Sequence, residues 1–251
     1  MNKLKDDLEE TGSLSTERYR QWFQENKAHQ TFSPWIHPLF NFGILLLTGA
    51  TSLYFTLEHG PLSLKNALLF PLTLLLGNLV VFLLHRFPLH RRYKLVPFPY
   101  DEHTVQHHRY FDSANVTLTG PKDFESIFFP WFIVLGFVLA TCPIFYGLGY
   151  LYNGYIAGLF FVFSACFYFT LYEIVHLSCH LRRDHWWLKI PGLRAMREHH
   201  RIHHHPKLMN RYNFCIVYPL MDYILGTKFK ESILPPEDSR DHYKDVIKNL
   251  D

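Results

Sequence analysis

The chain contains an uncharged run of 47 residues, 126–172, with no Asp, Glu, Lys, Arg or His. As one helix it would extend about 70 Å, while the hydrocarbon core of a bilayer is roughly 30 Å thick. The run is therefore predicted to cross a membrane twice, turning in the cluster GLGYLYNGY (147–155). Two further uncharged runs, 38–57 and 66–84, are each long enough for one crossing.

These runs predict an all-α integral membrane protein with four transmembrane helices, at about 38–57, 66–84, 126–147 and 153–175. A soluble helical protein is disfavoured, because buried core helices rarely stay uncharged for so long. The expected organisation is a cytoplasmic amino-terminal segment, 1–36, followed by a membrane domain, 37–251. Within that domain, the loop 85–125 and the tail 176–251 would form a helical cap carrying a histidine-rich dimetal site.

The basic residues indicate which side of the membrane carries the cap. Lys and Arg number 5 in residues 1–36, 6 in 85–125 and 13 in 173–251, leaving only Lys65 on the opposite side. This asymmetry predicts cytoplasmic termini, in a bacterial inner membrane or the endoplasmic reticulum. The net charge of +3, with no basic tract interleaved with aromatic residues, gives no indication of nucleic-acid binding.

Ten of the 17 histidines form four clusters, all on the predicted cytoplasmic side. Histidine is a common metal ligand, and ten imidazoles exceed what one ion can hold. Two six-coordinate metals with five ligands each would leave an open position on each, as activation of a small molecule requires. The predicted ligands are His85, His90, His103, His107, His108, His176, His180, His200, His203 and His204.

The spacing suggests how these ligands pair, because residues i and i+3 or i+4 share a helix face. His176 with His180 and His103 with His107 are such pairs, and His108 would point toward a second metal. In the stretch EHHRIHHH (198–205), positions 200, 203 and 204 share a face and are expected to close on one point. Positions 85 and 90 can act together only if the helix is broken, as the intervening Pro88 would allow.

Five sequence motifs carry a family resemblance: HRFPLH (85–90), HTVQHH (103–108), YEIVHLSCH (172–180), HHRIHH (199–204) and NFCIVYPLMDYILGT (213–227). In order and spacing they resemble the fatty acid hydroxylase/sterol desaturase superfamily of membrane di-iron oxygenases. The first and third are most similar to the fatty acid 2-hydroxylase branch. The second motif is one residue longer than the HxxHH usual in that branch.

The resemblance implies an O2-dependent di-iron enzyme that hydroxylates an acyl chain or a related membrane lipid. Two iron ions would be the cofactor, with O2 as co-substrate, and zinc could replace iron in a purified sample. No HPGG haem motif occurs in residues 1–36, so electrons are expected from a separate cytochrome b5 or ferredoxin. A desaturase on the same scaffold is the alternative. A zinc transporter is disfavoured because the uncharged runs 38–57, 66–84 and 126–172 contain no Asp, Glu, Lys, Arg or His that could pass an ion through the membrane.

Four residues are expected to support the ligands, because metal-bound imidazoles usually donate their second N–H to a carboxylate or carbonyl. Glu173 and Asp222 also match acidic positions in the family pattern and rank first. The other two are Glu198, for which an ordinary interfacial charge is an equal alternative, and His199.

Overall fold

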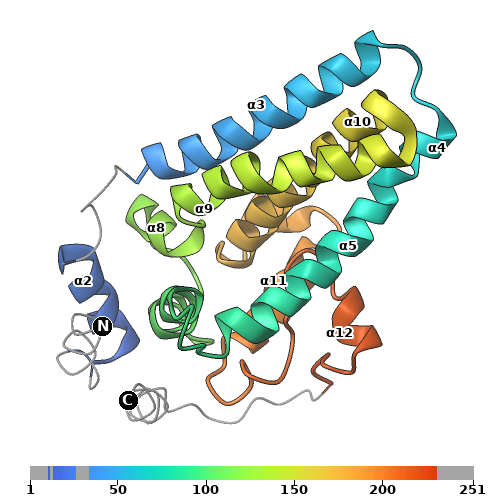
Figure 1. Ribbon diagram of the computed structural model, residues 1–251. Coiled ribbons are helices and arrows are strands. Elements are labelled where there is room, and N and C mark those ends of the chain that lie inside the picture. The colour runs from blue at the N-terminus through green and yellow to red at the C-terminus, as the bar shows by residue number, and fades with distance from the viewer. Residues whose placement is uncertain (1–10, 12–13, 27–33, 231–251) are drawn as a thin grey trace. The chain divides into compact units, whose positions relative to one another are not determined.

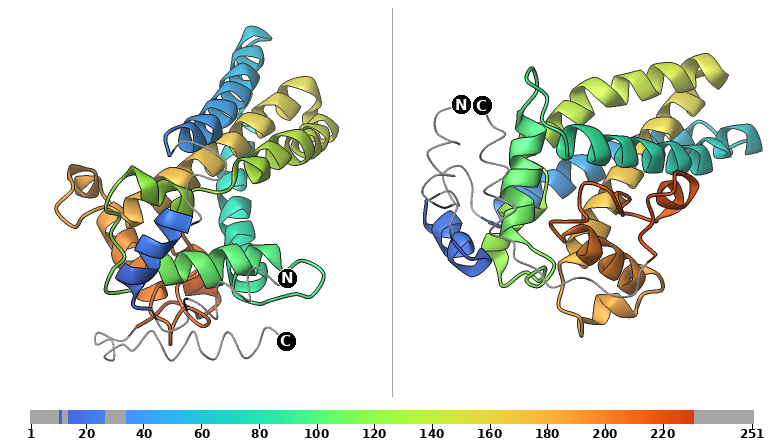
Figure 2. Two further views of the ribbon diagram at one scale, coloured as in Figure 1. Left: turned by 90° about the vertical axis from the view of Figure 1, so that its left-hand side faces the viewer. Right: turned by 90° about the horizontal axis from the view of Figure 1, so that it is seen from below.

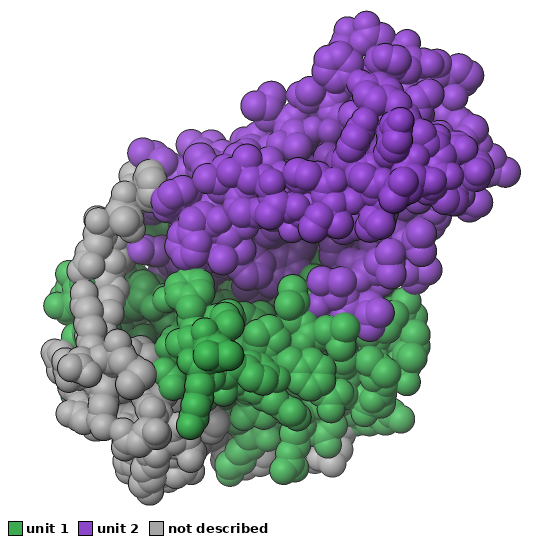
Figure 3. Space-filling model, viewed as in Figure 1, with its two compact units in different colours: residues 1–30, 81–122, 178–251 green, residues 31–80, 123–177 purple. Residues whose placement is uncertain are grey.

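A computed structural model describes Thr11, residues 14–26 and residues 34–230. Parts of the predicted amino-terminal segment 1–36 and tail 176–251 therefore lie outside the described residues. Those that are described form helices and loops without a β-strand, as the sequence predicts. They divide into two compact units, 1–30 with 81–122 and 178–251, and 31–80 with 123–177 (Figure 3). We call these unit 1 and unit 2.

Among the described residues, three helical segments are long and apolar enough to cross a membrane: Ile36–Glu58 (α3), Leu64–Leu89 and Trp131–Cys179 (Figure 1). The second comprises α4 (Leu64–Ala67), α5 (Leu69–Leu84) and the π-helix η1 (His85–Leu89). The third comprises α9 (Trp131–Gly136), the π-helix η4 (Phe137–Thr141) and α10 (Cys142–Cys179).

The third segment is a helical hairpin rather than one straight helix. Its backbone leaves helical geometry at Asn153 (φ −159°, ψ 34°) and at Gly154, whose φ of 79° is readily adopted by glycine. Beyond this break the chain returns along itself, with the rings of Phe145 and Phe161 4.7 Å apart. The two views of Figure 2 show this reversal.

The hairpin modifies the predicted spans. Only two residues separate its arms, so three continuous helical segments are found where four were predicted. The first arm begins at Trp131 rather than 126, because an extended backbone at Phe128 and Pro130 ends the short helix α8 (Phe124–Ile127). The reversal itself falls at the end of the predicted turn, 147–155.

Both turns of unit 2 lie together. Lys65 Nζ donates to Asn153 Oδ1 at 3.2 Å, and Asn153 Nδ2 donates to Asn66 Oδ1 at 2.6 Å. Side chains then pack along the helices, as where Phe70 stacks on Phe163 and Phe40 meets Trp131 edge-on. Unit 2 is thus a bundle of four helical stretches with the hairpin tip beside the loop that joins α3 to α4.

Unit 1 contains shorter helices: α2 (Thr16–Asn26), the consecutive helices α6 (Phe98–Tyr100), η2 (Asp101–His107) and α7 (His108–Tyr110), and α11 (Leu193–His203) and α12 (Leu220–Ile224). The 3-10 turn η5 (Trp186–Lys189) is also in this unit, and a second 3-10 turn, η3 (Pro121–Asp123), ends on the first residue of the next stretch of unit 2. The carboxyl end of α5 contributes Phe82, which packs against Phe214 and Cys215. This unit holds nine of the ten predicted ligands.

Candidate metal centre

Two π-helices place histidines five residues apart on one face. A π-helix closes its hydrogen bonds from i to i+5, so residues at that separation are one turn apart. His85 opens η1 and His90 follows its end, and their rings are 5.0 Å apart. His103 lies in η2 and His108 follows it, with ring centroids 4.8 Å apart. Pro88 lies inside η1 and provides the predicted departure from α-helical geometry.

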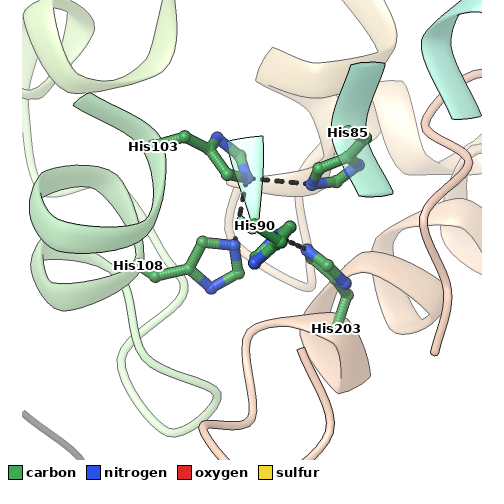
Figure 4. A group of neighbouring side chains, drawn as sticks. All are labelled: His85, His90, His103, His108 and His203. Carbon is green, nitrogen blue, oxygen red and sulfur yellow. Dashed lines mark hydrogen bonds between the residues drawn. The ribbon is translucent and has the colours of Figure 1, made fainter. Parts of the chain in front are cut away.

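These pairs converge with one residue of α11 to form the first histidine group, His85, His90, His103, His108 and His203 (Figure 4). One ring nitrogen from each lies within 4.8 Å of the others. The Nε2 atoms of His85 and His103 are 2.9 Å apart, as are those of His90 and His203. All five side chains are almost fully buried.

The second histidine group in unit 1 consists of His107, His180, His200 and His204. Nitrogens of the first three lie within 4.8 Å of one another. His204 joins them, since its Nε2 lies 2.9 Å from that of His200. His176, in unit 2, is one turn before His180 on the same face of α10 and is also buried.

Two predicted groupings are divided between the two histidine groups. The rings of His103 and His107 stack with centroids 5.1 Å apart, as expected for an i,i+4 pair, but His103 lies in the first group and His107 in the second. Likewise His200, His203 and His204 do not close on one point. His203 faces the first group, while His200 and His204 face the second. All ten predicted ligands are nevertheless either in the two groups or, for His176, next to one along the helix.

Backbone carbonyls fix the orientation of four rings. Nδ1 of His85 lies 2.6 Å from the Phe214 oxygen, and Nδ1 of His203 lies 2.9 Å from that of Tyr212. In the second group, His180 donates to Val116 at 2.8 Å and His204 to Phe111. Because a carbonyl oxygen can only accept, the proton of each neutral ring is on Nδ1 and the lone pair is on Nε2. Each Nε2 is then available to a metal.

His90 is oriented by a side chain that sequence reasoning missed. The Thr104 hydroxyl donates to the Leu89 carbonyl at 2.6 Å and accepts from His90 Nδ1 at 3.2 Å. The only available signal was a hydroxyl residue inside the motif HTVQHH. The orienting carbonyls left no signal, since every residue has one.

This arrangement suits a bound cation. His90 and His203 both carry a lone pair on Nε2. These two atoms are 2.9 Å apart, but neither can donate a hydrogen bond to the other. Two nitrogens bound at right angles to one ion at about 2.1 Å would be about 3 Å apart, close to this separation. Burial, and then the neighbouring rings, also hold the pKa of His90, His103 and His108 well below its usual range. The rings are therefore neutral at pH 7, as metal ligands must be.

Asp222 supports the first group through the backbone. Its carboxylate accepts the N–H groups of Phe214 at 2.9 Å and Cys215 at 2.8 Å, and the Thr227 hydroxyl at 2.7 Å. Burial alone would raise the pKa of Asp222, but these bonds and one from His199 hold it well below its usual range. The carboxylate therefore fixes Phe214, whose carbonyl orients His85.

The other predicted supporting residues contact different partners. His199 accepts from Lys228 at Nδ1 and donates from Nε2 to Asp222 at 3.0 Å. Glu198 pairs with Arg201 at 2.8 Å and Arg197 at 3.1 Å, in a partly exposed ion network. Glu173 is fully buried in unit 2, where it accepts from the Phe129 N–H at 3.4 Å.

The sequence was also compared with known proteins. The family model described as fatty acid hydroxylase matches residues 70–227, which include every histidine of both groups. The chain belongs to the fatty acid hydroxylase family. No curated protein and no solved structure matches it. Family membership, together with the apolar helices and the buried histidines, identifies a membrane protein of an oxidoreductase family with residues that could bind metal.

Proposed function

We propose that this fatty acid hydroxylase family member is an O2-dependent di-iron enzyme that hydroxylates an acyl chain or a related membrane lipid. The observation that carries the proposal is the convergence of the predicted ligands into two buried groups of neutral imidazoles. The first group would hold one iron ion. The second, with His176, would hold the other.

Two iron ions bound there would supply, with O2 and electrons, the oxidising power that an inert alkyl C–H bond requires. The chain's own residues fix the ligand set and exclude water. Carbonyls hold the protons of His85, His180, His203 and His204 on Nδ1. Side-chain exposure of His180, His200, His203 and His204 is zero, so bulk water does not compete for their Nε2 atoms.

The proposal includes the route of substrate and electrons. The ligands follow directly after apolar helices, since His85 continues α5 and His180 follows α10, so a lipid could approach from the bilayer. A separate cytochrome b5 or ferredoxin would deliver electrons. The chain would cross the membrane four times, with both histidine groups on the cytoplasmic side.

Mass spectrometry of total lipids tests the reaction, in cells that express the wild type or His203→Ala. We expect a lipid that gains one oxygen in the wild type and is absent from the variant. The control is His59→Ala, an exposed histidine outside both groups. A product lacking two hydrogens would instead make the protein a desaturase with the same ligands. A hydroxylated product that persists in His203→Ala would refute the ligand assignment.

A further inference from the structure

Helix α2 lies before the family match, which begins at residue 70, yet it packs within the unit that holds the histidines. The ring of Phe23 packs edge-on against that of Tyr110, with centroids 5.2 Å apart. Tyr110 lies in α7, the helix that follows the π-helix η2. Arg109 lies over the Tyr19 ring at 4.2 Å and donates to Thr11. Figure 2 shows α2 in blue beside the green helix formed by α6, η2 and α7.

Arg20 connects α2 by hydrogen bonds to the segment 110–117. Its guanidinium is buried, with 8% of the residue exposed. It donates to the carbonyl oxygens of Tyr110 at 2.6 Å, Thr117 at 3.2 Å and Asn115. A planar guanidinium can hold several acceptors in fixed directions, so Arg20 fastens both ends of the segment 110–117.

The fastened segment orients the second histidine group. Between the acceptors of Arg20 lie the Phe111 and Val116 carbonyls, which take the Nδ1 protons of His204 and His180. The Phe111 ring also contacts two ligand rings, His180 at 4.4 Å and His107 at 5.5 Å. The Arg20 guanidinium lies over that same ring, 4.8 Å from its centroid.

We propose that Arg20 is a positioning residue for metal binding by the second histidine group. It acts through Phe111 and Val116 on His107, His180 and His204. This inference rests on the metal sites of the proposed function but concerns only one of the two groups. The first group receives its orienting carbonyls from Phe214 and Tyr212, outside the segment that Arg20 holds.

A second contact from α2 acts on the same segment. The Thr16 hydroxyl donates to Asp112, whose carboxylate also accepts the N–H of Ala114 at 2.9 Å and of Asn115 at 2.7 Å. These bonds form a local turn between the two orienting carbonyls. Thr16 and Arg20 lie one helical turn apart, so both contacts use one face of α2.

The test measures zinc binding by the full-length protein in detergent, so it is independent of enzymatic activity. Metal-free wild type, Arg20→Ala and Arg20→Lys are loaded with Zn²⁺, and bound zinc and its release to EDTA are measured. Arg18→Ala is the matched control, because Arg18 is on the same helix but exposed. Loss of a partner that orients a ligand typically weakens metal binding 10–100-fold.

We expect two zinc ions in wild type and Arg18→Ala, with one released about tenfold faster from Arg20→Ala. Arg20→Lys should fall between, since lysine keeps the charge but loses the planar donor set. Combining Arg20→Ala with a ligand variant of either group shows which of the two zinc ions is affected. Arg20→Ala should accelerate release of the zinc that remains in His203→Ala but not of that in His180→Ala.

Equal release from wild type and both Arg20 variants would overturn the inference and leave the proposed function intact. Faster release of both ions would also overturn it, because Arg20 would then act on the fold as a whole. If Arg20→Ala does not yield folded protein, Arg20→Lys decides by the same comparison. A wild type that binds no zinc and no iron would instead refute the metal sites themselves.

Discussion

At the scale of single residues, the site depends on which ring nitrogen carries the proton. Four histidines are fixed by backbone carbonyls, which no substitution removes directly. His90 is different, because its Nδ1 partner is the hydroxyl of Thr104. The tautomer of one ligand in the first group can therefore be altered without changing the ligand.

Replacing Thr104 by valine should weaken metal binding by the first group. Valine keeps the shape but removes the acceptor for His90 Nδ1, so the ring loses its preference for a lone pair on Nε2. We expect a 10–100-fold loss of affinity for one of two metals, measured by chelator competition. Thr104→Ser keeps the hydroxyl and is the control. Unchanged affinity in Thr104→Val would show that the hydroxyl does not set the tautomer.

The pKa values of the buried histidines predict acid sensitivity of the metal-free protein. Burial lowers the pKa of His90, His103, His108, His203 and His204 well below 6.5, the value of an ordinary histidine. Below pH 6.5 the unfolded chain therefore binds more protons than the folded one. The free energy of unfolding must fall as the pH falls, by at most about 1.4 kcal/mol per pH unit per histidine.

Thermal unfolding between pH 7.5 and 5.5 measures this effect. The unfolding temperature of the metal-free protein should drop steadily once the pH is below 6.5. Protein loaded with zinc should drop less over the upper part of that range, because bound metal opposes protonation of its ligands. A metal-free protein whose unfolding temperature is constant down to pH 5.5 would contradict the neutral state of these rings.

At the scale of elements, π-helices and close helix packing position the chemistry. Sequence reasoning found the ten histidines because their motifs are short and local. It did not predict how they divide between the two groups, because η2 departs from 3.6 residues per turn and because α11 presents His203 to one group and His200 to the other. Arg20 could not be found from sequence, because its partners are carbonyls at least 90 residues away.

The close packing of the two arms of the helical hairpin predicts which glycines can be replaced. A Cβ added at Gly149 would lie 2.6 Å from the Ala157 carbonyl oxygen in the opposite arm, whereas one added at Gly147 would meet nothing within 4 Å. Gly149→Ala should force the arms apart and destabilise the protein by about 1–3 kcal/mol. Gly147→Ala should be neutral or slightly stabilising, since alanine favours helix. Thermal unfolding in detergent compares the two, and equal unfolding temperatures would contradict the close contact.

At the scale of the whole molecule, the basic residues and the turns of unit 2 both indicate how the chain crosses the membrane. The sequence predicts four crossings from uncharged runs, and 24 of the 25 Lys and Arg residues fall on the predicted cytoplasmic side. Within unit 2, the hairpin tip at Asn153 contacts Lys65 and Asn66 in α4, directly after the first turn. Two turns at one end of a bundle fit two reversals on one side of a membrane.

Labelling of single added cysteines tests this topology. His59→Cys lies in the first turn, and Asp184→Cys lies in the loop after α10, both at exposed positions. The four natural cysteines are buried, so they should react slowly and can remain. The cells must carry the protein in a membrane whose non-cytoplasmic side faces outward. In these intact cells, a reagent that cannot cross the membrane should label position 59. It should label position 184 only after lysis. Labelling of both positions in intact cells would refute a cytoplasmic histidine cap. Labelling of position 184 alone would invert the topology, because the positive residues would then face away from the cytoplasm.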